Sequence, residues 1–342
     1  MKRRRVMVLG SAIVVVLLAA APVVAPRLGI DITVINEVLL DALAAMSVNL
    51  LLGYTGLPAF GNAAFFGLGA YGAALSIKYL DVGFVSAIAI GTATAFVGGL
   101  LIGPFLLRRR GIYFGLLAIA FGQVFYFIAY RFTNFTGGED GMSISRPDFA
   151  LFGPPHAINA TVYYYVCLVV FVAIVAAFWV IAVSPFGQTL MAIRQNETRV
   201  RYLGLSSDRF IFVALMTAAT AGGLGGSLYA MLINFAYPLL LDWHESGNFV
   251  LMTLLGGAGT VWGPLLGAVI YVVGKDVLST ITQAWQLIIG GIFVICVLAF
   301  PRGILGSLST LTQRRNPADD PLAEANAAFD PKPPIAEGRN VS

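Results

Sequence analysis

Charged residues are scarce in this chain: Asp, Glu, Lys and Arg make up 11% of its 342 residues, whereas soluble domains contain about 25%. Hydrophobic residues make up 58% of the chain. The core of a soluble protein cannot absorb that much apolar surface, so the expected solvent is the lipid bilayer. The composition therefore excludes a soluble globular domain. The lipid bilayer is the expected environment, and no nucleic acid is expected as a partner.

Cysteine and histidine are also rare, with two residues of each type. Cys167 and Cys296 lie in apolar runs outside any CxxC or Cys/His pattern, which excludes a disulfide framework and a zinc site. His156 and His244 fall in expected loops without metal-ligand spacing. We therefore expect no metal site, and both cysteines are interpreted as ordinary small hydrophobic residues.

Catalytic signatures are missing as well. The chain has no G-x-S-x-G or HExxH pattern, so an intramembrane hydrolase is not favoured and no catalytic residue is expected. A phosphate loop is absent too, because Gly274 and Lys275 are followed by Asp276 and no glycine stands five residues before Gly274. We expect no cofactor, and ATP, if it drives this protein, must be bound by another chain.

Long apolar runs fill most of the sequence. A helix of about 20 apolar residues crosses the hydrocarbon core of a bilayer. This criterion predicts an all-α polytopic membrane protein with about ten transmembrane helices, near residues 6–25, 33–52, 60–79, 84–107, 112–130, 161–183, 210–233, 247–262, 263–279 and 285–300. The first run begins like a secretory signal but is longer than a typical signal core, so we interpret it as a retained helix; cleavage is the alternative.

The placement of basic residues predicts the orientation. Threading ten helices puts four basic groups on one side of the membrane: Arg3–Arg5, Arg108–Arg110, Arg194–Arg209, and Arg302 with Arg314 and Arg315. That side is the expected cytoplasm, and both termini lie there. Residues 1–306 form the predicted transmembrane permease domain, and residues 307–342, rich in Pro, Ala, Asp and Glu, form a predicted disordered cytoplasmic tail.

One polar segment, residues 184–209, interrupts the apolar runs. Apolar residues recur at helical spacing within it, at Phe186, Leu190, Ile193, Val200 and Leu203. This pattern predicts a short amphipathic helix on the cytoplasmic surface. A membrane protein that presents a patterned helix to the cytosol is expected to present it to a partner.

Glycine and proline cluster at two predicted helix breaks. The runs GYTGLPAFGN and GGAGTVWGP contain the candidate break residues Gly56, Gly61, Gly256, Gly257, Gly259 and Pro264. Irregular backbone at membrane depth must be buried in protein or line a wet cavity, so broken or re-entrant segments beside a substrate path are one interpretation. Simple tight loops are the other.

Polar residues inside the predicted spans are few. The candidate residues of a translocation path are Asn49, Asn62, Phe65 and Gln123; for the three amides the alternative is a hydrogen bond between helices. Glu37 and Asp41 share one helix face, and Glu37 and Lys275 stand near enough to an interface to snorkel. No chain of intramembrane acids and histidines is apparent, which counts against a proton-coupled transporter.

Several ordered motifs resemble one known family. They are NLLLGYTGLPAFGNAAFFGLGAYGAAL (Asn49–Leu75), IAFGQ (Ile119–Gln123), TGGEDGM (Thr136–Met142), SPFGQTLMAIRQNETRVRYLG (Ser184–Gly204), LLGGAGTVWGPLLGA (Leu254–Ala268), WQLIIGG (Trp285–Gly291) and FPRGILG (Phe300–Gly306). The chain resembles the LivM-type permease subunits of branched-chain amino-acid ABC importers. Asn62 replaces the family's usual His, and Pro58 and Ala59 replace a more typical Leu-Ser, so urea, short amides or aromatic acids are alternative cargoes.

The resemblance implies a fold like that of type II ABC importers and a bacterial inner-membrane location. It also implies three kinds of partner: a second, LivH-type permease, two cytoplasmic ABC ATPases and a periplasmic substrate-binding protein. The segment Ser184–Gly204 would act as a rigid lever docked on an ATPase, with Pro185, Phe186, Gly187, Arg194, Asn196, Glu197 and Gly204 as its coupling residues. The binding protein would dock on Thr133–Gly141 and Pro238–Asn248.

Two other classes of function are weighed against this one. A secondary transporter would drive uptake from an ion gradient without an ATPase. A purely structural membrane partner would tolerate disruption of the segment 184–209.

Overall fold

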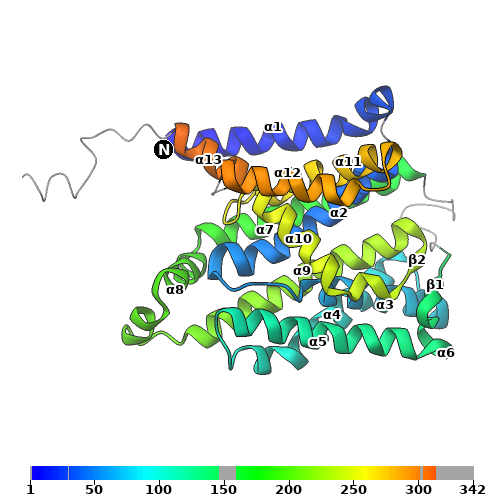
Figure 1. The fold of residues 1–342 in the computed structure, drawn as a ribbon, viewed down its shortest axis with the longest axis horizontal. Helices are drawn as coiled ribbons and strands as arrows, with labels where there is room; N and C mark the ends of the chain where they lie inside the picture. The colour runs from blue at the N-terminus through cyan, green and yellow to red at the C-terminus, as the bar shows by residue number, and fades with distance from the viewer. Residues whose placement is uncertain (1, 30, 146–158, 301–302, 313–342) are drawn as a thin grey trace, which may run out of the picture.

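The chain folds into a bundle of long helices (Figure 1). The computed structural model describes residues 2–29, 31–145, 159–300 and 303–312. The long helices are α1 (Lys2–Val24), α2 (Ile32–Val48), α3 (Asn62–Leu80), α4 (Phe84–Leu106), α5 (Ile112–Arg131), α7 (Ala160–Val183), α9 (Ser207–Ile233), α10 (Trp243–Gly256), α11 (Gly263–Ile281) and α12 (Trp285–Ala299). Each of them falls on one predicted span, which confirms the all-α polytopic fold.

Short elements connect these helices. They are η1 (Ala25–Leu28), the π-helix η2 (Asn49–Thr55), α6 (Thr133–Thr136), η3 (Gly138–Asp140), β1 (Met142–Ser143), α8 (Pro185–Tyr202), β2 (Phe235–Ala236), η4 (Pro238–Leu241) and α13 (Gly303–Thr312). Helix α13 runs past the expected boundary at residue 306, and the rest of the expected tail, residues 313–342, lies outside the described residues.

Seven helical stretches among the described residues are long and apolar enough to cross a membrane. They are Ile32–Thr55, Asn62–Leu80, Phe84–Leu106, Ile112–Arg131, Ala160–Val183, Ser207–Ile233 and Gly263–Ile281. Helix α10 has only 14 residues, and it begins and ends earlier in the chain than the predicted range 247–262. The helix begins earlier because the Asp242 side chain caps its first turn, and it ends earlier because Gly257 has φ 123°.

Helices α3, α4 and α9 form the closely packed centre. The glycines of the third and seventh predicted spans face one another there: a Cβ at Gly69 would overlap the Gly223 carbonyl, and a Cβ at Gly226 would overlap that of Phe66. The Ser227 hydroxyl adds a hydrogen bond to the Gly69 carbonyl at 3.1 Å. Small residues let helix backbones approach closely, which is how this sequence packs its centre.

Helix α1 packs against α7 through an unusual hydrogen bond. Pro22 lies inside α1 and has no N–H to bond the carbonyl of Leu18, four residues earlier. The buried hydroxyl of Tyr164 in α7 donates to that carbonyl at 2.6 Å. The proline thus leaves a free acceptor, and the tyrosine uses it to fix one helix against the other.

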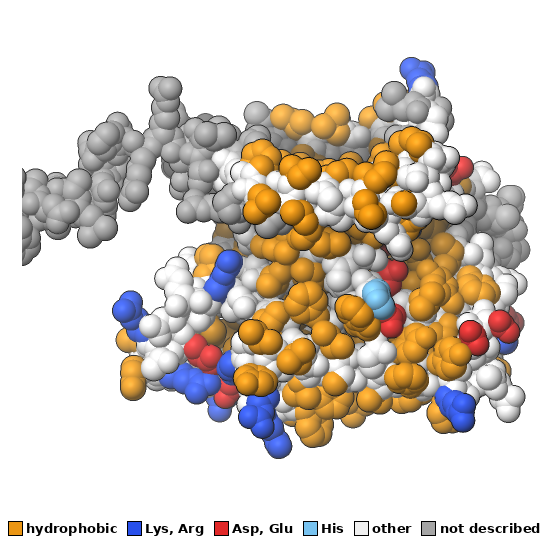
Figure 2. Space-filling model, viewed as in Figure 1, with side chains coloured by type: hydrophobic (Ala, Val, Ile, Leu, Met, Phe, Trp, Pro, Cys, Tyr) orange, Lys and Arg blue, Asp and Glu red, His pale blue; other side chains and the backbone are white. Residues whose placement is uncertain are grey.

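The two ends of the bundle differ in charge. Figure 2 shows basic side chains gathered around α8, with acidic side chains among them. The start of α1 and helix α13 lie toward the same end (Figure 1); we call it the α8 end. At the opposite end β1 pairs antiparallel with β2, Met142 facing Ala236 and Ser143 facing Phe235. This pairing joins the two loops expected to receive a binding protein.

Candidate functional site: the surface helix and the helix breaks

Helix α8 leaves α7 through a tight turn that its first residues determine. The Ser184 hydroxyl caps the helix by accepting from the Gly187 amide at 3.2 Å, and Pro185 occupies the first turn. Gly187 is buried, and a Cβ there would overlap the Ile181 carbonyl. The Ser-Pro-x-Gly sequence therefore sets the angle at which α8 departs.

Helix α8 is kinked and is therefore not the single continuous helix that its periodicity predicts; whether it moves as a rigid lever stays a prediction. Asn196 has φ −160° and ψ 95°, outside the helical region. Its side-chain oxygen accepts from the Arg199 amide at 2.9 Å and so caps a second helical segment. Asparagine caps helices well because its side chain competes with the helical backbone. The predicted coupling residue Asn196 thus divides α8 in two.

The apolar face of α8 is buried as predicted over most of its length. Leu190, Ile193 and Val200 are buried, and Phe186 stacks on Phe210 of α9 with ring centroids 5.6 Å apart. The prediction failed for Leu203, whose side chain is 74% exposed.

Leu203 is exposed because α8 ends at Tyr202, and Gly204 turns the chain away with φ 82°. Tyr202 is 87% exposed, and Leu205 is exposed as well. Three apolar side chains, Tyr202, Leu203 and Leu205, therefore stand in solvent at the α8 end; we call them the apolar step.

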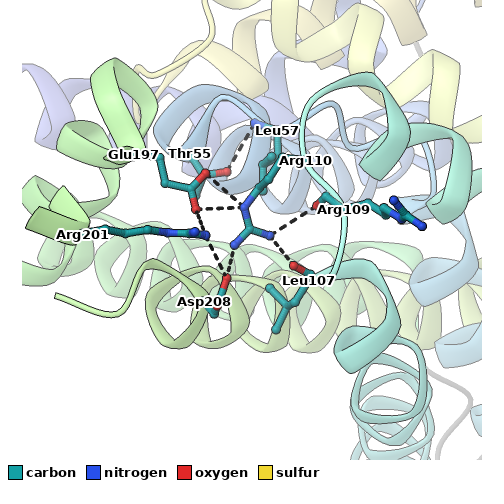
Figure 3. Close-up of polar contacts among 8 residues, drawn as sticks. All are labelled: Thr55, Leu57, Leu107, Arg109, Arg110, Glu197, Arg201 and Asp208. Carbon is teal, nitrogen blue, oxygen red and sulfur yellow. Dashed lines mark hydrogen bonds and ion pairs between the residues drawn. The ribbon is translucent and has the colours of Figure 1, made fainter. Parts of the chain in front are cut away.

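A salt-bridge network anchors the second segment of α8 to the core (Figure 3). Arg110, from the loop between α4 and α5, places its Nε 3.0 and 3.1 Å from the two carboxylate oxygens of Glu197, and it also pairs with Asp208 of α9. Arg201 donates to Glu197 at 2.7 Å. The side chains of Arg110 and Glu197 are only about a quarter exposed.

Sequence reasoning missed Arg110 and Asp208. The run Arg108–Arg110 was used only to predict the orientation in the membrane. It also places a cation in a short loop on the same side as Glu197, and this feature could have predicted the ion pair. The structure shows that Glu197 is held by this loop.

The first segment of α8 touches both predicted helix breaks. The Arg194 guanidinium donates to the Gly53 carbonyl at the end of η2. In the same place Asn49 donates to the Thr260 carbonyl at 2.8 Å and accepts from the Gly259 amide at 2.7 Å. One cluster of polar contacts therefore joins α8, η2 and the α10–α11 loop, which lie far apart in sequence.

The candidate break residues stand at helix ends. Gly56 ends η2 with φ 73°, and Gly61 precedes α3. Gly256 closes α10, where a Cβ would overlap the Gly263 carbonyl, and Pro264 lies in the first turn of α11. Gly257 and Gly259, with φ 123° and 86°, form the turn between these two helices.

The candidate path residues are mostly engaged within the chain. Asn49, Asn62 and Phe65 are buried, and Asn62 donates to the Ser47 hydroxyl at 2.9 Å. Gln123 donates to Asp242 at 3.2 Å. Asn62 therefore bonds α3 to α2, and Gln123 bonds α5 to the capping residue of α10. A narrow pocket lies beside them, lined by Phe60, Gly61, Ala64, Ile119, Gly122, Leu241, Trp243 and Ser246.

Charged side chains from three helices meet in the half of the bundle away from α8. They are Glu37 and Asp41 of α2, Glu245 of α10 and Lys275 of α11, which we call the charged cluster. The Lys275 ammonium lies 2.9 Å from a carboxylate oxygen of Glu37, and both side chains are partly exposed. This cluster could not be predicted from the sequence, because Glu245 falls in an expected loop and Lys275 is distant in sequence from α2.

At the opposite end, Asp242 caps α10 by accepting from the His244 amide at 2.9 Å. Burial raises the pKa of the Asp242 carboxyl, but hydrogen bonds from His244 and Gln123 stabilise its charged form and outweigh burial, so the pKa lies below its ordinary value. Asp242 is therefore a charged cap next to the charged cluster.

Comparison with known proteins identifies related permeases. Residues 32–298 match the family described as "Branched-chain amino acid transport system / permease component". The chain is 28% identical over 315 residues to the high-affinity branched-chain amino acid transport system permease protein LivM of Escherichia coli K12, covering 85% of this chain and 73% of the relative. The LivM of Salmonella typhimurium LT2 is 26% identical over 311 residues, with the same coverage.

A probable LivM of Methanocaldococcus jannaschii is 25% identical over 274 residues, covering 69% of this chain and 78% of the relative. No solved structure matches the chain.

Proposed function

Because the chain belongs to the family of permease components of branched-chain amino acid transport systems, we propose that it is the transmembrane permease subunit of an ATP-driven importer. In this proposal it forms the translocation path together with a second, LivH-type permease. Two cytoplasmic ABC ATPases supply the energy, and a periplasmic binding protein delivers the cargo. The chain itself carries no recognisable phosphate loop, which is in keeping with separate ATPase subunits.

The proposed location is the bacterial inner membrane, crossed several times, with the α8 end in the cytoplasm. Basic side chains at that end support this orientation, since lysine and arginine are enriched in cytoplasmic loops. Both termini then face the cytoplasm, and the β1–β2 pair with its flanking loops faces the periplasm, where a binding protein docks.

The observation that carries the proposal is the construction of α8. Its buried face and the Arg110–Glu197 ion pair fix it to the core, while the apolar step, Tyr202, Leu203 and Leu205, stays in solvent. Exposed apolar side chains rimmed by charge are typical of a protein interface. We assign this surface to the groove of an ATPase subunit.

The proposed cargo is leucine, isoleucine and valine, because the related permeases are named for branched-chain amino acids. The departures at Pro58, Ala59 and Asn62 keep urea, short amides and aromatic acids as alternatives. Asn62 is buried and bound to Ser47, so its change from histidine alters a contact between helices.

Reconstitution tests the class of protein. Vesicles are prepared with this chain, the second permease and the ATPases. They are expected to take up leucine only when ATP is present on the side of the membrane that carries the ATPases and loaded binding protein is present on the opposite side. Gradient-driven uptake by this chain alone would instead establish a secondary transporter.

The coupling surface is tested with Leu203→Asp, which places a charge in the apolar step without touching a buried contact. We expect loss of ATPase binding and of uptake, with thermal stability unchanged. Thr198→Asp, an equally drastic change at an exposed position of α8, is the matched control. Full uptake by the Leu203 variant would exclude the apolar step as the docking surface.

A further inference from the structure

The charged cluster contains more acid than base. Three carboxylates, those of Glu37, Asp41 and Glu245, surround one ammonium group, that of Lys275. Helix α2 packs against both α10 and α11, so these three helices bring the four residues together. The side chains of Glu37 and Lys275 remain partly exposed. A charge within a membrane costs on the order of 3 kcal/mol unless it is paired or faces a cavity. A positive group from outside would therefore stabilise the acids that Lys275 does not pair with.

Asp41 is the side chain that lacks a partner. It is 8% exposed, and within the described residues it makes no hydrogen bond and no ion pair. Its neighbours are otherwise occupied: Glu37 holds Lys275 at 2.9 Å, and Glu245 accepts from the Asn248 amide group at 3.1 Å. A buried carboxylate without a partner points to a ligand that supplies donors.

We propose that the charged cluster binds the zwitterionic head group of an amino acid in transit, with the cargo's ammonium group at Asp41 and its carboxylate at Lys275. This inference rests on the proposed function and assigns the residues that hold its cargo. An ammonium group has three donors for the carboxylates of Asp41 and Glu245. The Lys275 ammonium group donates one of its three N–H groups to Glu37, and its other N–H groups remain to donate to the cargo carboxylate.

A zwitterion suits the cluster better than an inorganic cation does. The Lys275 ammonium repels a bare metal ion placed among the carboxylates, whereas a zwitterion brings a negative group to Lys275 as well as a positive group to Asp41.

The cluster also lies where cargo would enter. Glu37 is near the start of α2 and partly exposed, and Asp41 is one helical turn, about 6 Å, further along the axis. A cargo released at the β1–β2 end would meet Glu37 and Lys275 first and Asp41 next.

The test uses Asp41→Asn in the complete importer reconstituted in vesicles. Leucine uptake is expected to fall about tenfold or more, the effect of losing a charge-assisted hydrogen bond, while ATP hydrolysis stimulated by loaded binding protein persists. Thermal stability is expected to stay equal or rise, because the change removes an unpaired buried carboxylate. A purely structural Asp41 would instead give lower stability together with normal uptake per folded complex, and that result would overturn the proposal.

Asp276→Asn is the matched control, since it makes the same chemical change one residue from Lys275. We expect it to transport normally; a loss equal to that of Asp41→Asn would overturn the assignment. In detergent, the wild-type complex without binding protein is expected to bind leucine but not 4-methylpentanoate, which has the same skeleton without the ammonium group. Equal binding of both would also overturn it, whereas absence of any ATP-dependent uptake by the wild type would refute the proposed function itself.

Discussion

The Arg194 guanidinium in α8 donates a hydrogen bond to the carbonyl oxygen of Gly53, in the last turn of η2. That carbonyl is available because the chain ends its helix there: the Leu57 amide bonds to Leu51 instead, and Pro58 has no N–H. A surface helix is thus attached to the irregular end of a membrane-spanning helix. Asn49 in the same π-helix holds the α10–α11 loop.

We predict that Arg194→Gln weakens transport without preventing assembly. The shorter, neutral side chain cannot reach Gly53 with a charged donor, so movement of α8 is no longer transmitted to η2. Uptake by the reconstituted importer should fall about tenfold, the effect of one lost charge-assisted hydrogen bond, while the ATPases still co-purify. Arg209→Gln, at an exposed position in the first turn of α9, should transport normally. Loss of uptake in both variants alike would argue for a general charge effect.

The pair Arg110 and Glu197 should show a measurable coupling energy. Each side chain is about a quarter exposed, so the pair is worth more than a fully exposed bridge, and we expect about 1 kcal/mol. Thermal unfolding of Arg110→Met, Glu197→Gln and the double variant gives the cycle. Arg201→Met with Glu197→Gln is a comparison within α8, where the more exposed arginine should couple less. Strict additivity of the Arg110 and Glu197 changes would contradict the anchoring role.

Much of this architecture could be predicted from the sequence, because it depends on local patterns. Ten apolar runs gave ten helices, and glycine with proline marked the ends of η2 and α10. The helix within residues 184–209 followed from its apolar periodicity, whereas the cap at Ser184 and the close approach of Gly187 to α7 were found only in the structure.

What could not be predicted depends on contacts between distant segments. Asp41 could be paired only with Glu37 on the same helix face, because nothing in the sequence brings residues 245 and 275 to α2. Arg110 looked like a topology signal for the same reason. The kink in α8 was missed for a local cause: the periodic apolar residues continue through Asn196, and only its capping bond to Arg199 interrupts the helix.

Tyr164→Phe should loosen α1 from α7 at a cost of about 1 kcal/mol. The change removes the hydroxyl that satisfies the Leu18 carbonyl and leaves that acceptor unpaired next to Pro22. Thermal unfolding in detergent measures the loss. In a Pro22→Ala background the alanine amide can bond Leu18 within α1, so the penalty for Tyr164→Phe should shrink. An undiminished penalty would show that the hydroxyl acts through some other contact.

Asp242 makes stability depend on pH in acid. Its pKa is lowered in the folded protein, so its charged form stabilises the fold; this contribution is complete above the unfolded pKa of about 3.9 and is lost as pH falls through the lower folded value. Asp242→Asn keeps a capping oxygen for His244 but carries no charge. The stability difference between wild type and this variant should therefore be constant from neutral pH to about pH 5 and shrink below about pH 4. Thermal unfolding across this range measures it, with Asp31→Asn at the exposed cap of α2 as a comparison. The Asp31 pKa is also lowered, by the Thr33 amide and hydroxyl, so a pH dependence of the same sign is expected there. A wild-type advantage at Asp242 that grew in acid would contradict the charged cap.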